Sequence, residues 1–242
     1  MSVAAPTSPA GSSLPSTPDG DAAWASATRA ALAQTDDALA VRFDRGDDVD
    51  ALVAARASAV DALIRAAWAR CLPGDAGLAL FAVGGYGRGE LFPQSDIDLL
   101  VLAEDPQQQA HRDALARFLA LLWDAGLQAS QAVRSPAQCT EAAADQTALT
   151  AMTESRALVA EESAADALRA AISPDRVWPA REYFQAKRAE QAQRHARRLD
   201  PGFAPHAQHQ AARRALIASK PGARFTGPYS ASADRAVVSA PA

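Results

Sequence analysis

Apolar residues in the first third of the chain recur with the three-to-four-residue period of amphipathic helices. One such stretch covers residues 24–43, and a second covers residues 49–71. The string RGDDVD interrupts the period between them, and Asp47 or Asp48 within it is suited to cap the second helix. The pattern therefore predicts two consecutive helices, the second ending before a Pro-Gly pair.

Two short apolar runs follow, and both are typical of strands that are buried on both faces. They are LALFAV, residues 78–83, and DIDLLVLA, residues 96–103. The segment between them contains several glycines and Pro93, so we expect a loop with at most one helical turn. Asp96 and Asp98 interrupt the second run, where a buried charge is unfavourable.

The next segment predicts one helix and a third strand. The helix is expected in QQQAHRDALARFLALLWDAG, residues 107–126, where Gly126 is suited to end it. Its apolar face is predicted to contain Leu115, Phe118, Leu119, Leu122 and Trp123. Residues 127–135, LQASQAVRS, alternate weakly and are compatible with a strand.

The remaining pattern is helical and then irregular. Residues 136–172 are rich in alanine and predict two or three short helices. Pro179 opens a helix with little apolar surface, and no sustained period is found from Asp200 onward. We expect a disordered leader (1–20), a folded domain with N-terminal helices (21–175), a polar basic helix (176–199) and an irregular, disordered tail (200–242).

Composition is that of a soluble, mildly acidic protein, with 242 residues and a net charge of −4. Cys71 and Cys139 form neither a disulfide framework nor a zinc-binding pair, which favours a reducing compartment. No stretch approaches the roughly 20 apolar residues that span a bilayer, and the N-terminus lacks the pattern of a signal peptide. We therefore expect a cytoplasmic protein without a membrane partner.

Basic residues concentrate toward the C-terminus, where residues 181–225 carry ten Lys or Arg against three Asp or Glu. Such a concentration occurs in proteins that bind phosphate or nucleic acid. A solvated helix face followed by a loose tail gives the same pattern. The second interpretation is the simpler one, and no nucleic-acid partner is predicted.

The candidate chemistry lies in the order strand, glycine pair, Asp-x-Asp. Gly84 and Gly85 let the backbone approach a ligand and direct amide N–H groups toward a polyphosphate. Asp96 and Asp98 are two positions apart on a strand, so both carboxylates lie on one face and are suited to bind Mg²⁺ or Mn²⁺. Each signal alone is common in turns and at strand edges, but their joint order and spacing indicate a functional site.

The string VGGYGRGELFPQSDIDLLVL resembles the N-terminal domain of the bacterial PII uridylyltransferase/uridylyl-removing enzymes, within the polymerase-beta-type nucleotidyltransferase superfamily. The strings LLWDAGLQASQAVRS, ESRALVA, REYFQAKRAEQAQRH and RASAVDALIRAAW fit the same family in order. The resemblance covers roughly residues 40–197. It implies a polymerase-beta-like α+β fold, with a small mixed sheet flanked by helices and with helical N-terminal and C-terminal extensions.

The resemblance also implies an activity, namely Mg²⁺-dependent transfer of UMP from UTP to a tyrosine of the nitrogen-signalling protein PII. Asp96 and Asp98 would then be the catalytic, metal-binding carboxylates. Gly84 and Gly85 would hold the triphosphate. The remaining nucleotide-binding residues carried over from the motif are Arg88 and Ser95.

Two departures from the family pattern concern the third acid and the C-terminus. The superfamily adds a third carboxylate on a later strand, but the expected strand offers Gln131, and the acids that follow it are Glu141, Asp145 and Glu154. The match stops near Arg197, and no hydrolase site of the uridylyl-removing type is expected, because no His-Asp pair is adjacent in sequence. A truncation or a frameshift after Arg197 is the hypothesis for residues 198–242.

Two alternatives stay open beside uridylyl transfer. The chain can be an inactive, truncated remnant that at most binds nucleotide, because a third acid is not evident. It can also be a nucleotidyltransferase with a different donor or acceptor, because no local motif specifies the base pocket.

Overall fold

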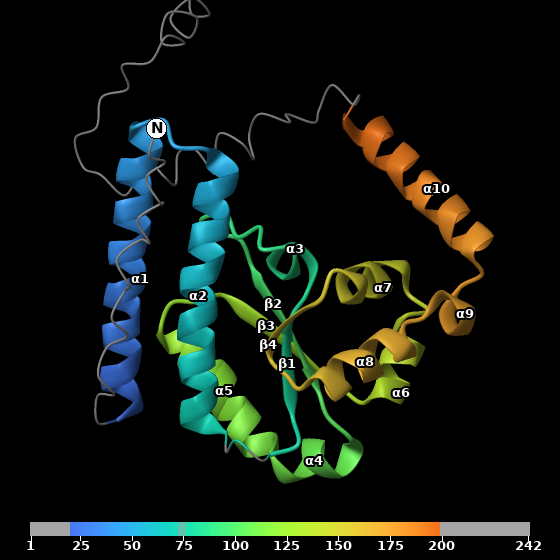
Figure 1. The fold of residues 1–242 in the computed structure, drawn as a ribbon, viewed down its shortest axis with the longest axis horizontal. Helices are drawn as coiled ribbons and strands as arrows, with labels where there is room; N and C mark the ends of the chain where they lie inside the picture. Colours follow the sequence, from blue (N-terminus) through green and yellow to red (C-terminus); the bar gives the residue numbers. More distant parts are fainter. Residues whose placement is uncertain (1–19, 73, 75, 199–242) are drawn as a thin grey trace, which may run out of the picture. The chain divides into compact units, whose positions relative to one another are not determined.

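Four strands form one mixed sheet, and helices pack against both of its faces (Figure 1). The computed structural model describes residues 20–72, 74 and 76–198. The described elements, in chain order, are α1 (Asp21–Asp44), α2 (Val49–Cys71), β1 (Ala79–Ala82), α3 (Gly84–Gly87), β2 (Ile97–Leu102), α4 (Asp105–Ala110), α5 (Arg112–Asp124), β3 (Ala129–Arg134), α6 (Pro136–Ala142), α7 (Gln146–Thr153), β4 (Arg156–Val159), α8 (Glu162–Ala171), α9 (Pro174–Val177) and α10 (Ala180–Arg198). The predicted α+β class with a small mixed sheet flanked by helices is confirmed.

The sheet has the strand order β3-β2-β1-β4. Strand β1 is antiparallel to both β2 and β4, whereas β2 and β3 are parallel. A parallel pair needs a crossover connection, and α4 with α5 supplies it between β2 and β3. The two central strands, β1 and β2, carry the glycine turn and the Asp-x-Asp motif at the same end of the sheet, because they are antiparallel and adjacent.

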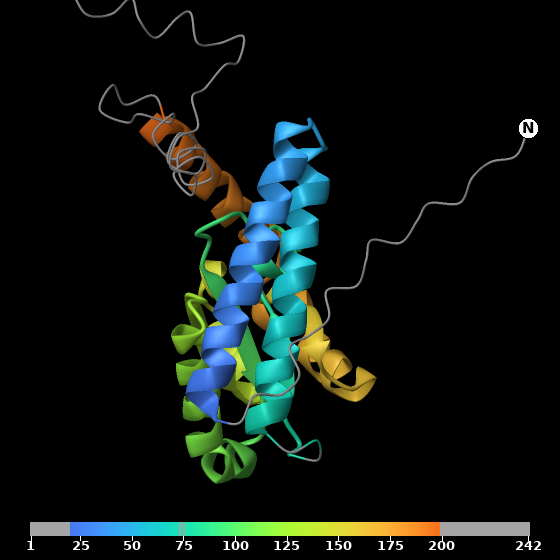
Figure 2. The ribbon, with the colours of Figure 1, turned by 90° about the vertical axis from the view of Figure 1, so that its left-hand side faces the viewer.

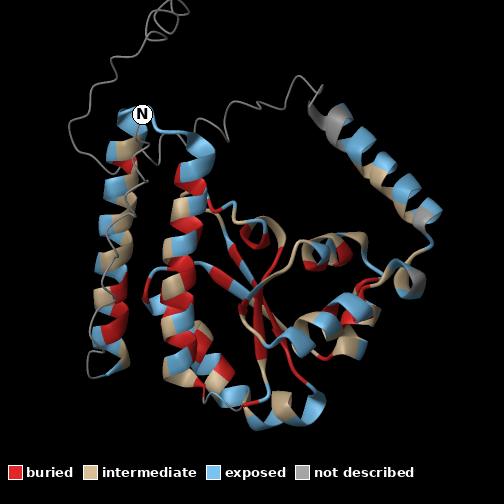
Figure 3. Cartoon of the chain, viewed as in Figure 1, coloured by how far each residue is buried: buried red, intermediate tan, exposed pale blue. Residues whose placement is uncertain are grey.

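Alternate side chains of the central strands enter two separate cores, as the period of two requires. In β1, Leu80 and Ala82 pack with α1, α2 and α5, whereas Ala79 and Phe81 pack with α6, α7 and α8. Strand β2 alternates in the same way, with Leu99 and Val101 on the first side and Leu100 and Leu102 on the second. Figure 3 shows the resulting burial along both strands.

The N-terminal helices agree with the prediction. Helices α1 and α2 lie side by side in both views (Figures 1 and 2) and cover one face of the sheet together with α5. The side chain of Asp48 caps α2 by accepting a hydrogen bond from the Ala51 N–H at 3.1 Å. Arg56 of α2 pairs with Asp36 of α1 at 2.8 Å, which joins the two helices.

The prediction of one helix over residues 107–126 is wrong, because the chain forms α4 and α5 with a break at His111. Helix α4 is mostly polar and buries none of its residues, whereas α5 buries an apolar face, so the two helices pack differently. The prediction that Trp123 belongs to the buried face is also wrong, since its side chain is 58% exposed. Gly126 ends α5 with a φ of +83°, as expected for a C-terminal glycine.

The segment after β3, where two or three short helices were predicted, contains the three helices α6 to α8 and also a strand that the pattern did not indicate. Strand β4 has only four residues, and only Leu158 in it is buried, so its apolar signal is weak. The predicted polar helix is present as α10. Within the described helices, none is long and apolar enough to cross a bilayer. Apart from Gly20, the predicted leader and the tail from Asp200 lie outside the described residues.

Candidate active site

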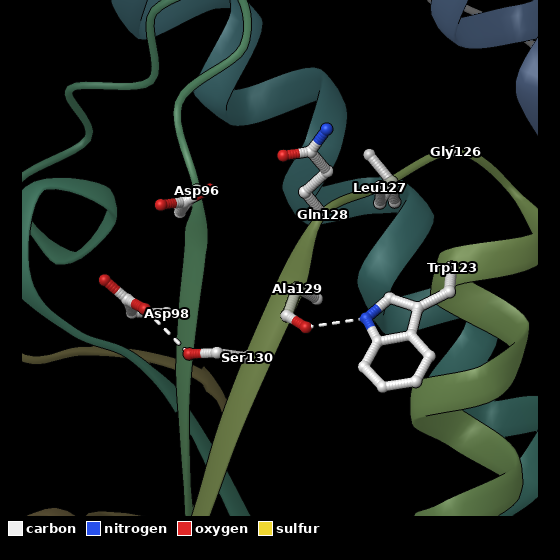
Figure 4. Close-up of a pocket in the computed structure, with 8 residues that line it drawn as sticks. All are labelled: Asp96, Asp98, Trp123, Gly126, Leu127, Gln128, Ala129 and Ser130. Carbon is white, nitrogen blue, oxygen red and sulfur yellow. Dashed lines mark hydrogen bonds between the residues drawn. The ribbon is translucent and has the colours of Figure 1, made fainter.

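The Asp-x-Asp motif lies at the start of β2, and its carboxylates are exposed. Strand β2 begins at Ile97, so Asp96 precedes the strand, and Asp98 is its single exposed residue. The expectation that the whole run is buried on both faces is therefore wrong at these positions. Both side chains point to the same side of β2 (Figure 4). Because both are exposed to solvent, neither charge carries the free-energy cost of burial.

Asp98 is held by the neighbouring strand. In the parallel register, Asp98 lies opposite Ser130, and the Ser130 hydroxyl donates a hydrogen bond of 2.7 Å to Asp98 Oδ1. Beside them is a pocket of about 490 Å³, lined by Asp96, Asp98, Trp123 and residues 126–130 (Figure 4). The pocket extends from the two carboxylates across the first residues of β3 to the exposed indole.

The glycine pair forms a single helical turn, α3, on the other side of Asp98. Gly84 has a φ of +60°, which favours glycine, and a Cβ there would lie 3.8 Å from Asp98 Oδ2. The first N–H groups of a helix have no partner within the helix, so those of α3 are available to a ligand. Gly84 thus lies next to the Asp98 carboxylate, and neither Gly84 nor Gly85 lines the pocket on the β3 side.

A polar network links α3 to α2 and β4. The Tyr86 hydroxyl, in α3, donates a 2.6 Å hydrogen bond to Asp61 of α2. Arg156 of β4 donates to Asp61 at 2.5 Å and to the main-chain oxygens of Tyr86 and Gly87 at 3.2 Å. Burial raises the pKa of Tyr86 far above its ordinary value, and the bond to Asp61 raises it further, so Tyr86 stays a proton donor. The network fixes the position of the glycine turn.

Arg88, the predicted phosphate contact, is occupied by two carboxylates. Its guanidinium donates to Glu90 at 2.7 Å and also to Glu154, which follows α7. The hydrogen bond that Arg88 donates to Glu90 raises the pKa of Arg88, so the charge is retained. Arg88 therefore joins the glycine turn to the end of α7, and a phosphate at its guanidinium would compete with these two carboxylates.

Gly87 allows the closest contact of the turn. A Cβ at Gly87 would lie 1.9 Å from the main-chain oxygen of Glu154 and 3.0 Å from that of Ala82. We expect Gly87→Ala to lower the free energy of unfolding by about 1–3 kcal/mol, because two main-chain segments have to separate. Gly74→Ala is the matched control, since a Cβ there meets no atom within 4 Å. Equal thermal unfolding of the two variants would contradict this contact.

Ser95 and the candidate third acids do not join the pocket. The Ser95 N–H closes a turn onto Phe92 O at 3.0 Å. Asp145 caps α7, and Glu154 is paired with Arg88. Among the described residues, Asp96 and Asp98 are the carboxylates that line the pocket, and the neighbour of Asp98 on β3 is Ser130.

The donor set fits a hard divalent cation that shares its coordination with a substrate. Within the described residues, no group of three or more His, Cys, Asp or Glu is suited to enclose a metal ion. Mg²⁺ is commonly bound by one or two carboxylates, with water and substrate phosphates as its other ligands. Asp96 and Asp98 supply two exposed carboxylates of this kind, and Asp98 Oδ2 faces the glycine turn.

Comparison with known proteins defines the class of this site. Residues 64–147 match the family described as Nucleotidyltransferase domain. This segment contains α3, β2, β3 and the pocket. The chain therefore carries a nucleotidyltransferase domain, and its mixed sheet flanked by helices is consistent with the polymerase-beta-like fold.

The chain is also similar over most of its length to bifunctional uridylyltransferase/uridylyl-removing enzymes. It is 62% identical to the enzyme of Xanthomonas campestris pv. campestris over 178 residues, which are 74% of this chain and 20% of the relative. It is 45% identical to the enzyme of Pseudomonas putida over 179 residues, 73% of this chain and 20% of that relative. The resemblance inferred from the sequence is confirmed, and the chain spans about one fifth of the length of these relatives.

Proposed function

We propose that the chain transfers UMP from UTP to a tyrosine hydroxyl of PII in a Mg²⁺-dependent reaction. The observation that carries the proposal is that Asp96 and Asp98 lie together, exposed, beside the glycine turn of a nucleotidyltransferase domain. The similar enzymes are uridylyltransferases, which supports UMP as the transferred group. The PII acceptor is inferred from the resemblance described above.

In the proposed reaction, the tyrosine oxygen forms a bond to the α-phosphorus of UTP. The bond between that phosphorus and the pyrophosphate breaks, and the phenolic proton passes to water. The amide groups of Gly84 and Gly85 orient the β- and γ-phosphates, and Asp96 and Asp98 would hold the cation. Bound Mg²⁺ would neutralise charge on the phosphates and on the leaving pyrophosphate.

The rest of the site supports these steps by position. Ser130 holds Asp98 Oδ1, so the other carboxylate oxygen is directed at the glycine turn. Arg88 is an additional phosphate ligand when it exchanges Glu90 or Glu154 for an oxygen of UTP. Ser95 lies in the turn before Asp96, and the proposal includes it among the residues that bind the nucleotide.

The test is a transfer assay with purified chain, PII and radiolabelled nucleotide. We expect label on PII with UTP and Mg²⁺, loss of label with EDTA, and recovery on adding Mg²⁺ or Mn²⁺. Parallel reactions with CTP and ATP identify the donor. Binding of UTP by calorimetry without any transfer would reject the proposed activity and favour a nucleotide-binding role.

A further inference from the structure

The two oxygens of Asp98 face opposite sides of the site. Oδ1 accepts the hydrogen bond from Ser130 on β3, and the position of a Gly84 Cβ is 3.8 Å from Oδ2. Strands β1 and β3 flank β2 on its two edges, and α3 follows β1. The carboxylate therefore separates the glycine turn from the pocket beside β3.

If the function proposed above is correct, this separation indicates which of the two substrates, UTP or the acceptor protein, binds in the pocket beside β3. In phosphoryl and nucleotidyl transfer, the attacking oxygen and the leaving oxygen are roughly in line on opposite sides of phosphorus. The leaving pyrophosphate is on the glycine side in the proposed function. The acceptor oxygen consequently approaches from the β3 side, where the pocket lies.

Trp123, in the pocket beside β3, is suited to bind an aromatic acceptor. Its indole is 58% exposed, yet its Nε1–H donates a 2.7 Å hydrogen bond to the Ala129 main-chain oxygen, which holds the ring in place (Figure 4). A fixed, exposed ring offers a surface on which another aromatic ring stacks or packs edge-on. Gln128 is exposed between Trp123 and Asp96 and adds an amide donor and acceptor.

We propose that the pocket formed by Asp98, Gln128, Ser130 and Trp123 is the acceptor subsite, and that Trp123 positions the tyrosine ring of the acceptor protein. A protein-borne tyrosine must enter from solvent, and the exposed indole at the far end of the pocket is the group it meets. The competing occupant of the same surface is the uracil base of UTP, which also stacks on aromatic rings. The two occupants differ in which substrate a Trp123 variant binds poorly.

The experiment measures initial rates of UMP transfer while PII and UTP are varied separately. We expect Trp123→Ala to raise the KM for PII about three- to tenfold, the effect of losing one aromatic pair, with an unchanged affinity for UTP in calorimetry. Trp123→Phe should recover most of the loss because it keeps a ring. Phe184→Ala is the matched control, since Phe184 is 62% exposed and lies outside this pocket.

The outcomes separate this inference from the proposed function. A wild-type chain that transfers no UMP to PII would reject the proposed function and the acceptor subsite together. An active wild type with an unchanged KM for PII in Trp123→Ala would reject only the subsite. An active wild type in which Trp123→Ala raises the KM for UTP would assign the indole to the nucleobase and overturn the inference.

Discussion

Replacing Asp96 and Asp98 together by asparagine is expected to reduce UMP transfer about a thousandfold or more. Both carboxylates are exposed on one side of β2, and asparagine has the same shape but no charge to bind a divalent cation. Losing the metal-dependent stabilisation of the transition state removes several kcal/mol, and each 1.4 kcal/mol is about tenfold in rate. Radiolabelled UMP on PII is the measurement.

The same variant should fold normally, because exposed substitutions usually change the free energy of unfolding by no more than about 0.5 kcal/mol. The matched control is Glu104→Gln with Asp105→Asn, which removes two exposed carboxylates just beyond the other end of β2. That control should keep both folding and transfer. Undiminished labelling by the Asp96 and Asp98 variant would refute the assignment of the site.

The second large effect is expected from Asp61→Ala, which acts on stability. The change leaves the Tyr86 hydroxyl and the Arg156 guanidinium without their shared acceptor behind α3. Removing one partner of a buried ion pair typically destabilises by about 3–5 kcal/mol, and the partial exposure of Arg156 places the expected loss at about 3 kcal/mol. Urea unfolding measures it, and the altered glycine turn should also weaken UTP binding.

Two variants serve as controls for Asp61→Ala. Asp61→Asn keeps an oxygen acceptor for Tyr86 and loses only the charge, so its destabilisation should be smaller. Asp166→Ala removes an exposed pair with Arg169 and should change stability by less than about 1 kcal/mol. If Asp61→Ala were as stable as Asp166→Ala, the network would have no role in holding α3.

Much of the fold follows from local patterns, and the exceptions have physical causes. Helices α1 and α2 were predictable from periods that extend over several turns, and β1 and β2 from continuous apolar runs, whereas α10 was predicted from helix propensity and β3 from a weak alternation. Strand β4 was not, because it has four residues and is stabilised by pairing with β1 about 75 residues earlier. Sequence patterns near β4 contain no sign of that partner.

For the site, the motif indicated where the carboxylates lie but not what surrounds them. The glycine turn and the Asp pair are adjacent in the structure because β1 and β2 form a hairpin-like antiparallel pair. The positions of Ser130 and Trp123 depend instead on the register of β3 and on the rotation of α5. The periodic pattern placed Trp123 on the apolar face beside the buried Leu122, and only the packing of α5 shows that the residue is exposed.

The contacts of β4 also bear on the order in which the site is built. Arg156 is separated by 69 residues from Gly87 and by 95 from Asp61. The hydrogen bonds that hold the glycine turn therefore connect residues that are far apart in the sequence. Forming such contacts carries an entropic penalty and slows folding relative to local contacts. During synthesis, β1 and β2, with the glycine turn and the Asp-x-Asp motif, leave the ribosome well before β4. The nucleotide site is therefore expected to mature late, after the ribosome has released the segment around Arg156.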